Sequence, residues 1–185
     1  MTEDGRAYTV GVLVQANYGV RDSLRIAGVP IGQHLREDRV YTDPALAIAG
    51  NKVPGGDTGS IIIVVATDAP LLPHQLDRIA KRAGMGLARM GSYAGNGSGD
   101  IFVAFSTANA AAAKGALRND ATFVGNDHLD DIFNATVQAT EEAIVNAMVA
   151  ARDMRGEDGH YANAIPHDAL VRLLKQYDRY QPGKK

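Results

Sequence analysis

Two long apolar runs dominate the pattern of hydrophobic and polar positions along the chain, and both predict buried strands. The first covers residues 7–17 and stays apolar until it ends in Gln15 and Asn17. The second is the β-branched run Ile61-Ile-Ile-Val-Val65. Short runs of this kind, bounded by turn-forming residues, are typical of strands buried inside a sheet. In all, the pattern predicts four strands, over residues 7–17, 23–29, 60–68 and 100–106.

Helical periodicity predicts the remaining elements. Between residues 72 and 90, apolar side chains recur every three or four positions, which places them on one face of a helix. A longer helix is predicted over 129–154 and a last one over 167–180, with a short helix at 44–49 inside a loop-rich stretch. The expected buried stripe of the longest helix is Ile132, Val137, Ala143, Ile144, Ala147 and Met148.

The order of these elements favours an α+β fold. Helices and strands are mixed, but consecutive strands such as 7–17 and 23–29 are joined by a turn rather than by a crossover helix. That arrangement is not typical of a doubly wound parallel sheet. With 185 residues the chain is long enough to bury a substantial core, so we predict a single domain over residues 1–185.

Composition narrows the classes of function. The 19 lysines and arginines nearly balance the 21 acidic residues and form no basic stripe, so no nucleic-acid partner is expected. No apolar run approaches the roughly 20 residues of a membrane helix, so no membrane partner is expected either. The lack of cysteine excludes thiol nucleophiles, and the default location is the cytoplasm. The five histidines show no metal-ligand spacing, so we expect no metal and no other cofactor.

The dipeptide Gly59-Ser60 lies where a turn-rich loop becomes the second apolar run. Ser60 can simply open the strand, or it can be a nucleophile that cuts its own chain and then uses its freed α-amine as a base. Asn17 ends the first run and poses a similar choice, because a buried amide must find partners and Asn17-Tyr-Gly19 is turn-like. Local features alone favour the structural interpretation at both positions.

The loop Gly95-Asn-Gly-Ser-Gly-Asp100 gathers three glycines, a hydroxyl and a carboxylate directly before a strand. One interpretation is a glycine-rich turn capped by Asp100. Another is a nest that binds phosphate, although the chain has no GxxxxGK[ST] motif. In a third, Ser98 and Asp100 form a hydroxyl–carboxylate relay that orients a nucleophile.

Longer stretches of the chain carry a resemblance to a known family. They are Tyr8-Thr-Val-Gly-Val-Leu-Val-Gln-Ala-Asn17, Ile26-Ala-Gly-Val-Pro-Ile-Gly32, the stretch from Gly59 to His74, Gly97-Ser-Gly-Asp100, Ala104-Phe-Ser-Thr107, Val137-Gln-Ala-Thr-Glu-Glu-Ala143 and Ile165-Pro-His-Asp168. These segments resemble the L-aminopeptidase D-Ala-esterase/amidase (DmpA) family, which includes the β-peptidyl aminopeptidases. The resemblance covers almost the whole chain, with its motifs in order.

The resemblance implies a fold and a set of site residues. Members of the family adopt an αββα sandwich similar to that of N-terminal nucleophile hydrolases, and their precursors cleave themselves before a serine or related residue. Carried onto this chain, the resemblance makes Gly59–Ser60 the self-cleaved bond, Ser60 the nucleophile and Asn17 part of the oxyanion hole. Ser98 and Asp100 match the second-serine and acid pair, with aspartate here where some members carry glutamate.

The implied reaction removes the N-terminal residue from a short peptide, amide or ester through an acyl-enzyme on Ser60. Gly59 has no Cβ and therefore tolerates the strained backbone that an N→O acyl shift requires. After self-cleavage, the α-amine of Ser60 has a reference pKa near ~7.7–8.0. It can therefore act as the general base without a histidine.

The family precursor has a large segment N-terminal to the part that this chain matches. We therefore expect this chain to be the C-terminal portion of the precursor and its sandwich to be incomplete. Open apolar surface needs cover, so a homo-oligomer or association with the missing N-terminal chain is expected. Two alternatives stay open, namely a catalytically inactive fragment that acts as an assembly partner and an ornithine-acetyltransferase-like acyltransferase. Ser60 argues against the latter, whose nucleophile is usually threonine.

Overall fold

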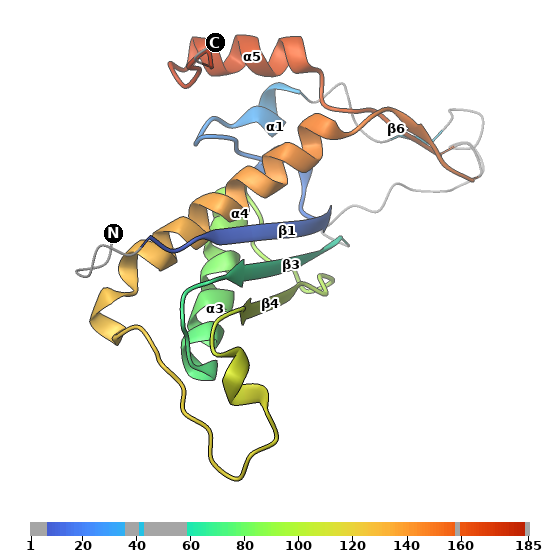
Figure 1. The fold of residues 1–185 in the computed structure, drawn as a ribbon. Coiled ribbons are helices and arrows are strands. Elements are labelled where there is room, and N and C mark those ends of the chain that lie inside the picture. The colour runs from blue at the N-terminus through green and yellow to red at the C-terminus, as the bar shows by residue number, and fades with distance from the viewer. Residues whose placement is uncertain (1–6, 36–40, 43–58, 158–159, 184–185) are drawn as a thin grey trace. The chain divides into compact units, whose positions relative to one another are not determined.

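The computed structural model describes residues 7–35, 41–42, 59–157 and 160–183 (Figure 1). The chain divides into two compact units. The first consists of Met1–Ala16, Ile61–Leu87 and Asp100–Ala143, and the second of Asn17–Ser60, Ala88–Gly99 and Ile144–Lys185. Among the described residues, no helix is both long and apolar enough to cross a membrane.

A three-stranded sheet runs through the first unit in the order β1 (Val10–Asn17), β3 (Ser60–Thr67) and β4 (Ile101–Ser106). β3 and β4 are parallel, and the helix α3 (Pro73–Arg89) connects them. β1 runs in the opposite direction (Figure 1). The mixed sheet confirms the predicted α+β class. The β3–α3–β4 crossover also forms a parallel pair of strands, which strands joined by a turn cannot form. The end residues Asn17 and Ser60 belong to the second unit.

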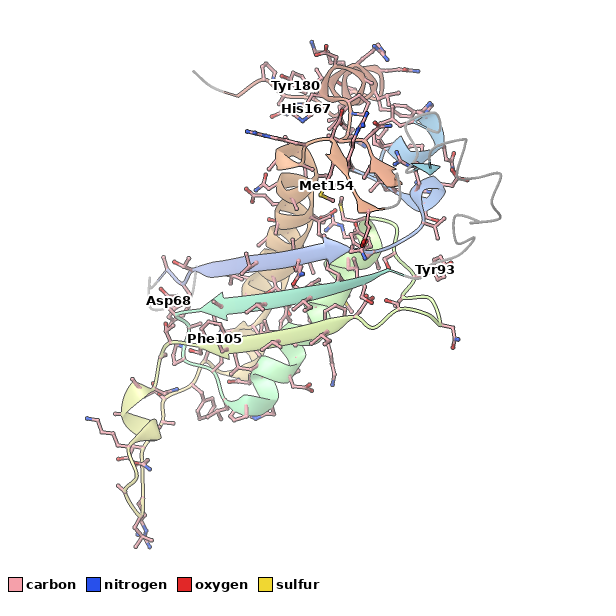
Figure 2. All side chains as sticks on the ribbon, turned by 90° about the vertical axis from the view of Figure 1, so that its right-hand side faces the viewer. Asp68, Tyr93, Phe105, Met154, His167 and Tyr180 are labelled. Carbon is pink, nitrogen blue, oxygen red and sulfur yellow. The ribbon has the colours of Figure 1, made fainter. Side chains whose placement is uncertain are left out.

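The two faces of this sheet differ in cover. Along β3, Ile61, Ile63 and Val65 have no exposed surface. On the opposite face of the same strand, Ile62 is exposed, whereas Val64 and Ala66 are half-buried among the residues that the structure describes. The large apolar side chains of that open face are Leu13 (72% exposed), Ile62 (40%), Ile101 (52%), Val103 (46%) and Phe105 (45%), the last labelled in Figure 2. A strand whose residues are apolar on both faces is therefore buried on only one of these faces.

Glycines allow α3 to pack closely against its neighbours. A Cβ added to Gly86 would lie 2.7 Å from the Cβ of Thr140 on α4 (Asp130–Ala150), and one added to Gly84 would lie 3.3 Å from the ring of Phe102 on β4. α3 therefore contacts both the covered face of the sheet and α4. This double contact explains why a helix of good amphipathic pattern tolerates two glycines, which otherwise destabilise helices.

The buried stripe of α4 was only partly predicted. Ile132 and Ile144 are buried as expected, Val137, Ala143 and Met148 are half-buried, and Ala147 is exposed. Two fully buried threonines, Thr136 and Thr140, complete the stripe instead. Each hydroxyl donates to the backbone carbonyl four residues earlier at 2.8 Å, which satisfies its polar group inside the core.

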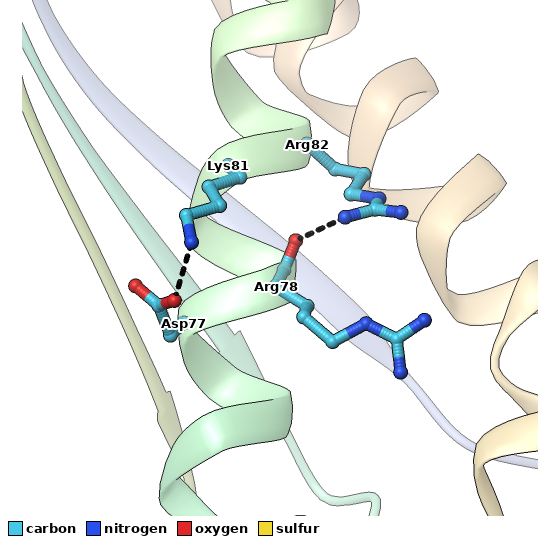
Figure 3. Close-up of polar contacts among 4 residues, drawn as sticks. All are labelled: Asp77, Arg78, Lys81 and Arg82. Carbon is cyan, nitrogen blue, oxygen red and sulfur yellow. Dashed lines mark hydrogen bonds and ion pairs between the residues drawn. The ribbon is translucent and has the colours of Figure 1, made fainter.

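The charged side of α3 also contributes to packing (Figure 3). Lys81 and Asp77 form an exposed ion pair with 2.7 Å between Nζ and Oδ2. Arg82 donates to the backbone carbonyl of Arg78 at 3.2 Å. Both guanidinium groups lie over the ring of Phe133 on α4, at 3.9 Å for Arg82 and 5.0 Å for Arg78. Cation–π contacts of this kind contribute roughly 0.5–1 kcal/mol each at exposed sites.

The connection from β4 to α4 is held at two points. The Asn109 side chain, at a backbone φ of 59°, donates to the Thr122 carbonyl and accepts from the Thr122 N–H, both at 2.9 Å. The buried amide of Gln75 on α3 donates to the Val124 carbonyl at 2.8 Å. Two short 3₁₀ helices lie in this connection, η2 (Ala110–Ala113) and η3 (Asn126–His128).

In the second unit, the strand predicted over 23–29 is wrong. The chain forms a short 3₁₀ helix, η1 (Arg21–Ser23), and then a tight turn closed by an isolated bridge between Ile26 and Val29. Both residues inside that turn, Ala27 and Gly28, have positive φ, at 50° and 80°. A backbone that reverses at this point cannot extend as a strand. The helix α1 (Ile31–His34) follows.

The C-terminal part of the second unit also departs from prediction. The long helix ends at Ala150 and not at 154, because Met154 pairs with Ala162 in a small antiparallel sheet. Its strands, in order, are β2 (Tyr41–Thr42), β6 (His160–Ala162) and β5 (Met154–Arg155). The last helix, α5 (His167–Gln176), follows Pro166 as predicted and is four residues shorter than expected. The helix expected at 44–49 lies outside the described residues.

Candidate active site

Ser60 is the first residue of β3 and is half-buried. Its Oγ accepts a hydrogen bond from the backbone N–H of Gly99 at 2.9 Å. A Cβ added to Gly99 would lie 3.3 Å from the same oxygen. The candidate nucleophile is therefore held at one end of the Gly91–Gly99 loop, next to a position where a side chain would crowd it.

Gly59 lies directly against the end of β1. A Cβ at this position would collide with the carbonyl oxygen of Asn17 and would lie 2.8 Å from the Cα of Tyr18. No flexible side chain is available to move aside, because the crowded atoms belong to backbone. Close approach of two backbones is thus a sufficient reason for glycine before Ser60. The expectation that this glycine tolerates a strained backbone stays a prediction.

The structure brings Asn17 to this junction. Asn17 is the exposed last residue of β1, and its carbonyl oxygen is the atom that a Gly59 side chain would strike. Asn17, Gly59 and Ser60 therefore lie together in the second unit. The role of the Asn17 amide as an oxyanion donor stays a prediction.

Ser98 lies in the same loop as Gly99. Its backbone N–H donates to the carbonyl of Gly95 at 2.8 Å, which closes a turn over four residues. Ser98 is therefore the sequence neighbour of the residue that binds the Ser60 hydroxyl. Gly99 itself was missed by the sequence argument, because its contribution is a backbone N–H. Its place between Ser98 and Asp100 was the only signal.

Asp100 belongs to the first unit and stabilises the start of β3. Its Oδ1 accepts a hydrogen bond from the backbone N–H of Ile61 at 3.1 Å. Because Ile61 follows Ser60, this carboxylate fixes the backbone next to the candidate nucleophile. This contact differs from the local cap of the glycine-rich turn that the sequence allowed, because the N–H of Ile61 lies 39 residues away in sequence. The proposed relay between Ser98 and Asp100 stays a prediction.

Tyr18 is a second residue that sequence reasoning missed. Its hydroxyl oxygen is buried and has no hydrogen-bond partner among the residues that the structure describes. Burial raises the pKa of Tyr18 to about 12, so the phenol is neutral at physiological pH. A neutral phenol is a hydrogen-bond donor and not a base. Its only sequence signal was its position directly after Asn17.

The described residues contain no group of three or more histidine, cysteine or acidic side chains that could hold a metal ion. The polar groups that the contacts bring together at the Ser60 junction are its own hydroxyl and the Gly99 N–H, with the backbone of Asn17 beside Gly59. Such groups are suited to nucleophilic attack and oxyanion stabilisation, the two requirements of acyl transfer.

Comparison with known proteins agrees with this chemistry. The β-peptidyl aminopeptidase BapA of Sphingosinicella microcystinivorans is 50% identical over 98% of this chain and 46% of its own length. The L-aminopeptidase D-Ala-esterase/amidase of Ochrobactrum anthropi, a prototype of the serine aminopeptidases, superposes with a TM-score of 0.80 and 46% identity, over 96% of this chain and 46% of its own. A β-aminopeptidase of a Burkholderia species superposes with a TM-score of 0.76 and 41% identity, over 98% and 48%.

These likenesses also decide the fold. The Ochrobactrum enzyme is a variant of the N-terminal nucleophile hydrolase fold, which confirms the fold type that the sequence resemblance implied. The chain spans less than half the length of the relatives that it matches, so it accounts for only part of that fold. Residues 1–162 match peptidase family S58. On this match and on the identity to its relatives, the chain belongs to peptidase family S58.

Proposed function

We propose that this chain carries the nucleophile of a self-processing serine aminopeptidase. The enzyme would release N-terminal residues from short peptides, amides or esters. The observation that carries the proposal is the junction at Ser60. Its hydroxyl binds the Gly99 N–H, and the residue before it is pressed against Asn17, in a chain whose relatives are aminopeptidases. This junction is where the sequence resemblance puts the self-cleaved bond.

Self-cleavage would begin with attack of Ser60 Oγ on the carbonyl carbon of Gly59. The Oγ–C bond forms, the C–N bond breaks, and the proton of the hydroxyl goes to the departing nitrogen. Water then hydrolyses the resulting ester, which leaves a carboxylate on Gly59 and a free α-amine on Ser60. Close packing of Gly59 against Asn17 supports the proposal, because it limits how far the scissile carbonyl can move from its attacking group.

The mature enzyme would use the same hydroxyl on its substrate. The α-amine of Ser60 takes the hydroxyl proton, Oγ attacks the substrate carbonyl, and the amine or alcohol leaves with that proton. Water then releases the acyl group from Ser60. Asn17 would donate to the oxyanion, an interaction whose loss typically lowers rates by roughly 10²–10³. Ser98 and Asp100 would hold the α-amine and hydroxyl in register.

The open face of the sheet supports a partner. It presents a row of large apolar side chains on β1, β3 and β4 that no described residue covers. Large exposed apolar patches are typical of sites that bind other proteins. The chain also spans only 46% of its β-peptidyl aminopeptidase relative. We propose that the part of the family polypeptide that this chain lacks, or a second copy of the chain, covers this face.

The same open face favours a second candidate function, a catalytically inactive piece that serves only in assembly. The two functions differ at one bond. The intact mass of the purified chain reports whether the Gly59–Ser60 bond is cut. It is measured for the chain alone and for the chain mixed with the part of a relative that this chain does not span. We expect fragments 1–59 and 60–185 from the wild-type chain and a single mass from Ser60→Ala. A bond that stays whole in both settings would leave only the assembly function.

Hydrolysis gives an independent test of the nucleophile. Aminoacyl p-nitroanilides release a coloured amine when the acyl group is transferred to the enzyme. We expect Ser60→Ala to lose this activity entirely, whereas Ser106→Ala, another serine on the same sheet, should retain most of it. Ser106 lies far from Ser60 in sequence, and its hydroxyl donates to the carbonyl of Ala69. It therefore serves as the matched control. Activity that survives in Ser60→Ala would move the nucleophile to another residue.

A further inference from the structure

The Ser60 hydroxyl makes one contact with a definite chemical consequence. A serine hydroxyl has one hydrogen to donate and two lone pairs to accept with. The Gly99 N–H occupies one lone pair at 2.9 Å. The second lone pair is left for attack on a carbonyl carbon, and the hydroxyl proton is left for a base. The contact therefore selects one orientation of the hydroxyl without using either of the groups that the reaction needs.

The loop that carries Gly99 is anchored at its start and closed into a turn near its end. At its start, Gly91 has a φ of 98° and lies so close to the carbonyl of Ser23 that a side chain would collide with it. The N–H of Arg25 donates to the carbonyl of Met90 at 3.2 Å. Near its end, the turn from Gly95 to Ser98 is closed at 2.8 Å. A donor on such a loop is in place before the reaction starts, which is the condition under which a dipole stabilises developing charge best.

Glycine at this position has a second effect. A Cβ on residue 99 would lie 3.3 Å from the Ser60 Oγ, tighter than ordinary van der Waals contact. A side chain at this position would therefore crowd the Ser60 hydroxyl. Both the donor and the missing side chain leave Ser60 able to react.

We propose that Gly99 is a positioning residue for Ser60, and this inference rests on the function proposed above. Its N–H holds the hydroxyl in the reactive orientation and strengthens its hydrogen bond as negative charge develops on Oγ. In the step concerned, the O–H bond breaks and its proton goes to the base, the Oγ–C bond forms, and the π pair of the carbonyl moves onto the carbonyl oxygen. Hydrogen bonds to charged acceptors are roughly twice as strong as neutral ones, so the Gly99 donor favours the transition state over the resting serine.

Hydrogen exchange tests the contact without any catalytic activity. In the full chain, the Gly99 amide should exchange with solvent several-fold faster in Ser60→Ala than in wild type, because its acceptor is gone. Ser60→Thr keeps an Oγ and should restore slow exchange. The Ser98 amide, which donates to Gly95, is the matched control and should not change. Equal exchange at Gly99 in wild type and Ser60→Ala would overturn the proposal.

Replacing one backbone amide by an ester tests the chemical role. Glycolate at position 99 removes the Gly99 N–H. Lactate at position 108 is the matched control, because it removes the Ala108 N–H, which donates to the Ser106 Oγ at 3.0 Å. The readout is the rate at which a fluorophosphonate labels Ser60, with fluoride leaving as the Oγ–P bond forms. We expect labelling to fall about tenfold to a hundredfold at position 99 and less than threefold at position 108.

The outcomes separate this inference from the proposed function. If wild-type Ser60 is labelled and the position-99 ester reacts equally fast, Gly99 does not position the nucleophile and the proposed function stands. If wild-type Ser60 is not labelled, even with the missing part of a relative supplied, the proposed function fails and the role of Gly99 fails with it. If the exchange result and the labelling result both follow the expectation, Gly99 joins Ser60 in the site.

Discussion

The two faces of the β1–β3–β4 sheet have nearly the same composition and opposite surroundings. On one face, the side chains of β3 are fully buried under helices, and on the other, equally apolar side chains are open among the described residues. Because period-2 alternation puts neighbouring residues on opposite faces, the two environments occur side by side in sequence. An apolar strand therefore indicates two covered faces, and here only one cover lies within the described chain.

The largest expected effect separates neighbouring isoleucines of β3. Ile63→Ala removes buried methyl groups from the covered face and should lower the free energy of unfolding by about 2–5 kcal/mol. Ile62→Ala, the matched variant on the open face, should lower it by less than ~1 kcal/mol. Denaturant titration of both variants measures the difference. Similar losses at the two positions would show that the open face is covered in the isolated chain.

The covered face also explains which parts of the fold were predictable. The strand at 60–68 and the helix at 72–90 were predicted nearly to their ends, because their apolar patterns are long and uninterrupted. The strand at 23–29 was wrong, because positive φ at Ala27 leaves no mark in a hydrophobic pattern. Threonine was read as polar, so the buried Thr136 and Thr140 were missed.

The candidate site was less predictable than the fold. Local chemistry alone assigned Ser60 and Asn17 structural roles, and only the family resemblance across the chain put them in one site. The structure adds their proximity through Gly59, a contact between segments 42 residues apart that no local pattern encodes. The Gly99 donor could not be predicted from sequence, because every residue except proline carries the same N–H.

A second prediction concerns the helix that covers the sheet. Gly86→Ala puts a methyl group 2.7 Å from Thr140 and 2.8 Å from the Val137 carbonyl, so α3 and α4 must separate. We expect a loss of about 1–3 kcal/mol in unfolding free energy, as is typical of overpacked cores. Gly84→Ala is the control, because its new methyl meets only the Phe102 ring at 3.3 Å, and better helix propensity offsets the crowding. Thermal unfolding that ranks the two variants in the opposite order would contradict this packing.

A smaller effect is expected at Tyr18, whose buried hydroxyl has no hydrogen-bond partner among the described residues, just as those residues leave the open face uncovered. Tyr18→Phe removes that hydroxyl and should be neutral or stabilising by up to about 1 kcal/mol at pH 7. The folded-state pKa of about 12 exceeds the ordinary value near 10. The stability linked to the neutral phenol is therefore full below pH 10 and is lost as the pH rises through 12.

Unfolding measured between pH 9 and pH 12 tests that sign. Wild type should lose stability more steeply than Tyr18→Phe across this range, and Tyr93→Phe, an exposed tyrosine in the same unit, should follow wild type. If Tyr18→Phe is destabilised by more than ~1 kcal/mol at pH 7, the hydroxyl has a partner in solution.

The smallest effect on folding is expected on the open face, where association should change instead. Val103→Ser with Phe105→Ser replaces two apolar side chains that the fold leaves exposed, so the unfolding free energy should change by no more than ~0.5 kcal/mol for each.

If this face binds a second copy or the missing part of the family polypeptide, sedimentation velocity should show weaker association in the double variant. Leu117→Ser, on the β4–α4 connection, removes a fully exposed apolar side chain away from the sheet and should leave association unchanged. Equal association in both variants would mean that the interface lies elsewhere, and a large loss of stability in the double variant would mean that the chain itself covers the face. Only weaker association with unchanged folding assigns the open face to a partner.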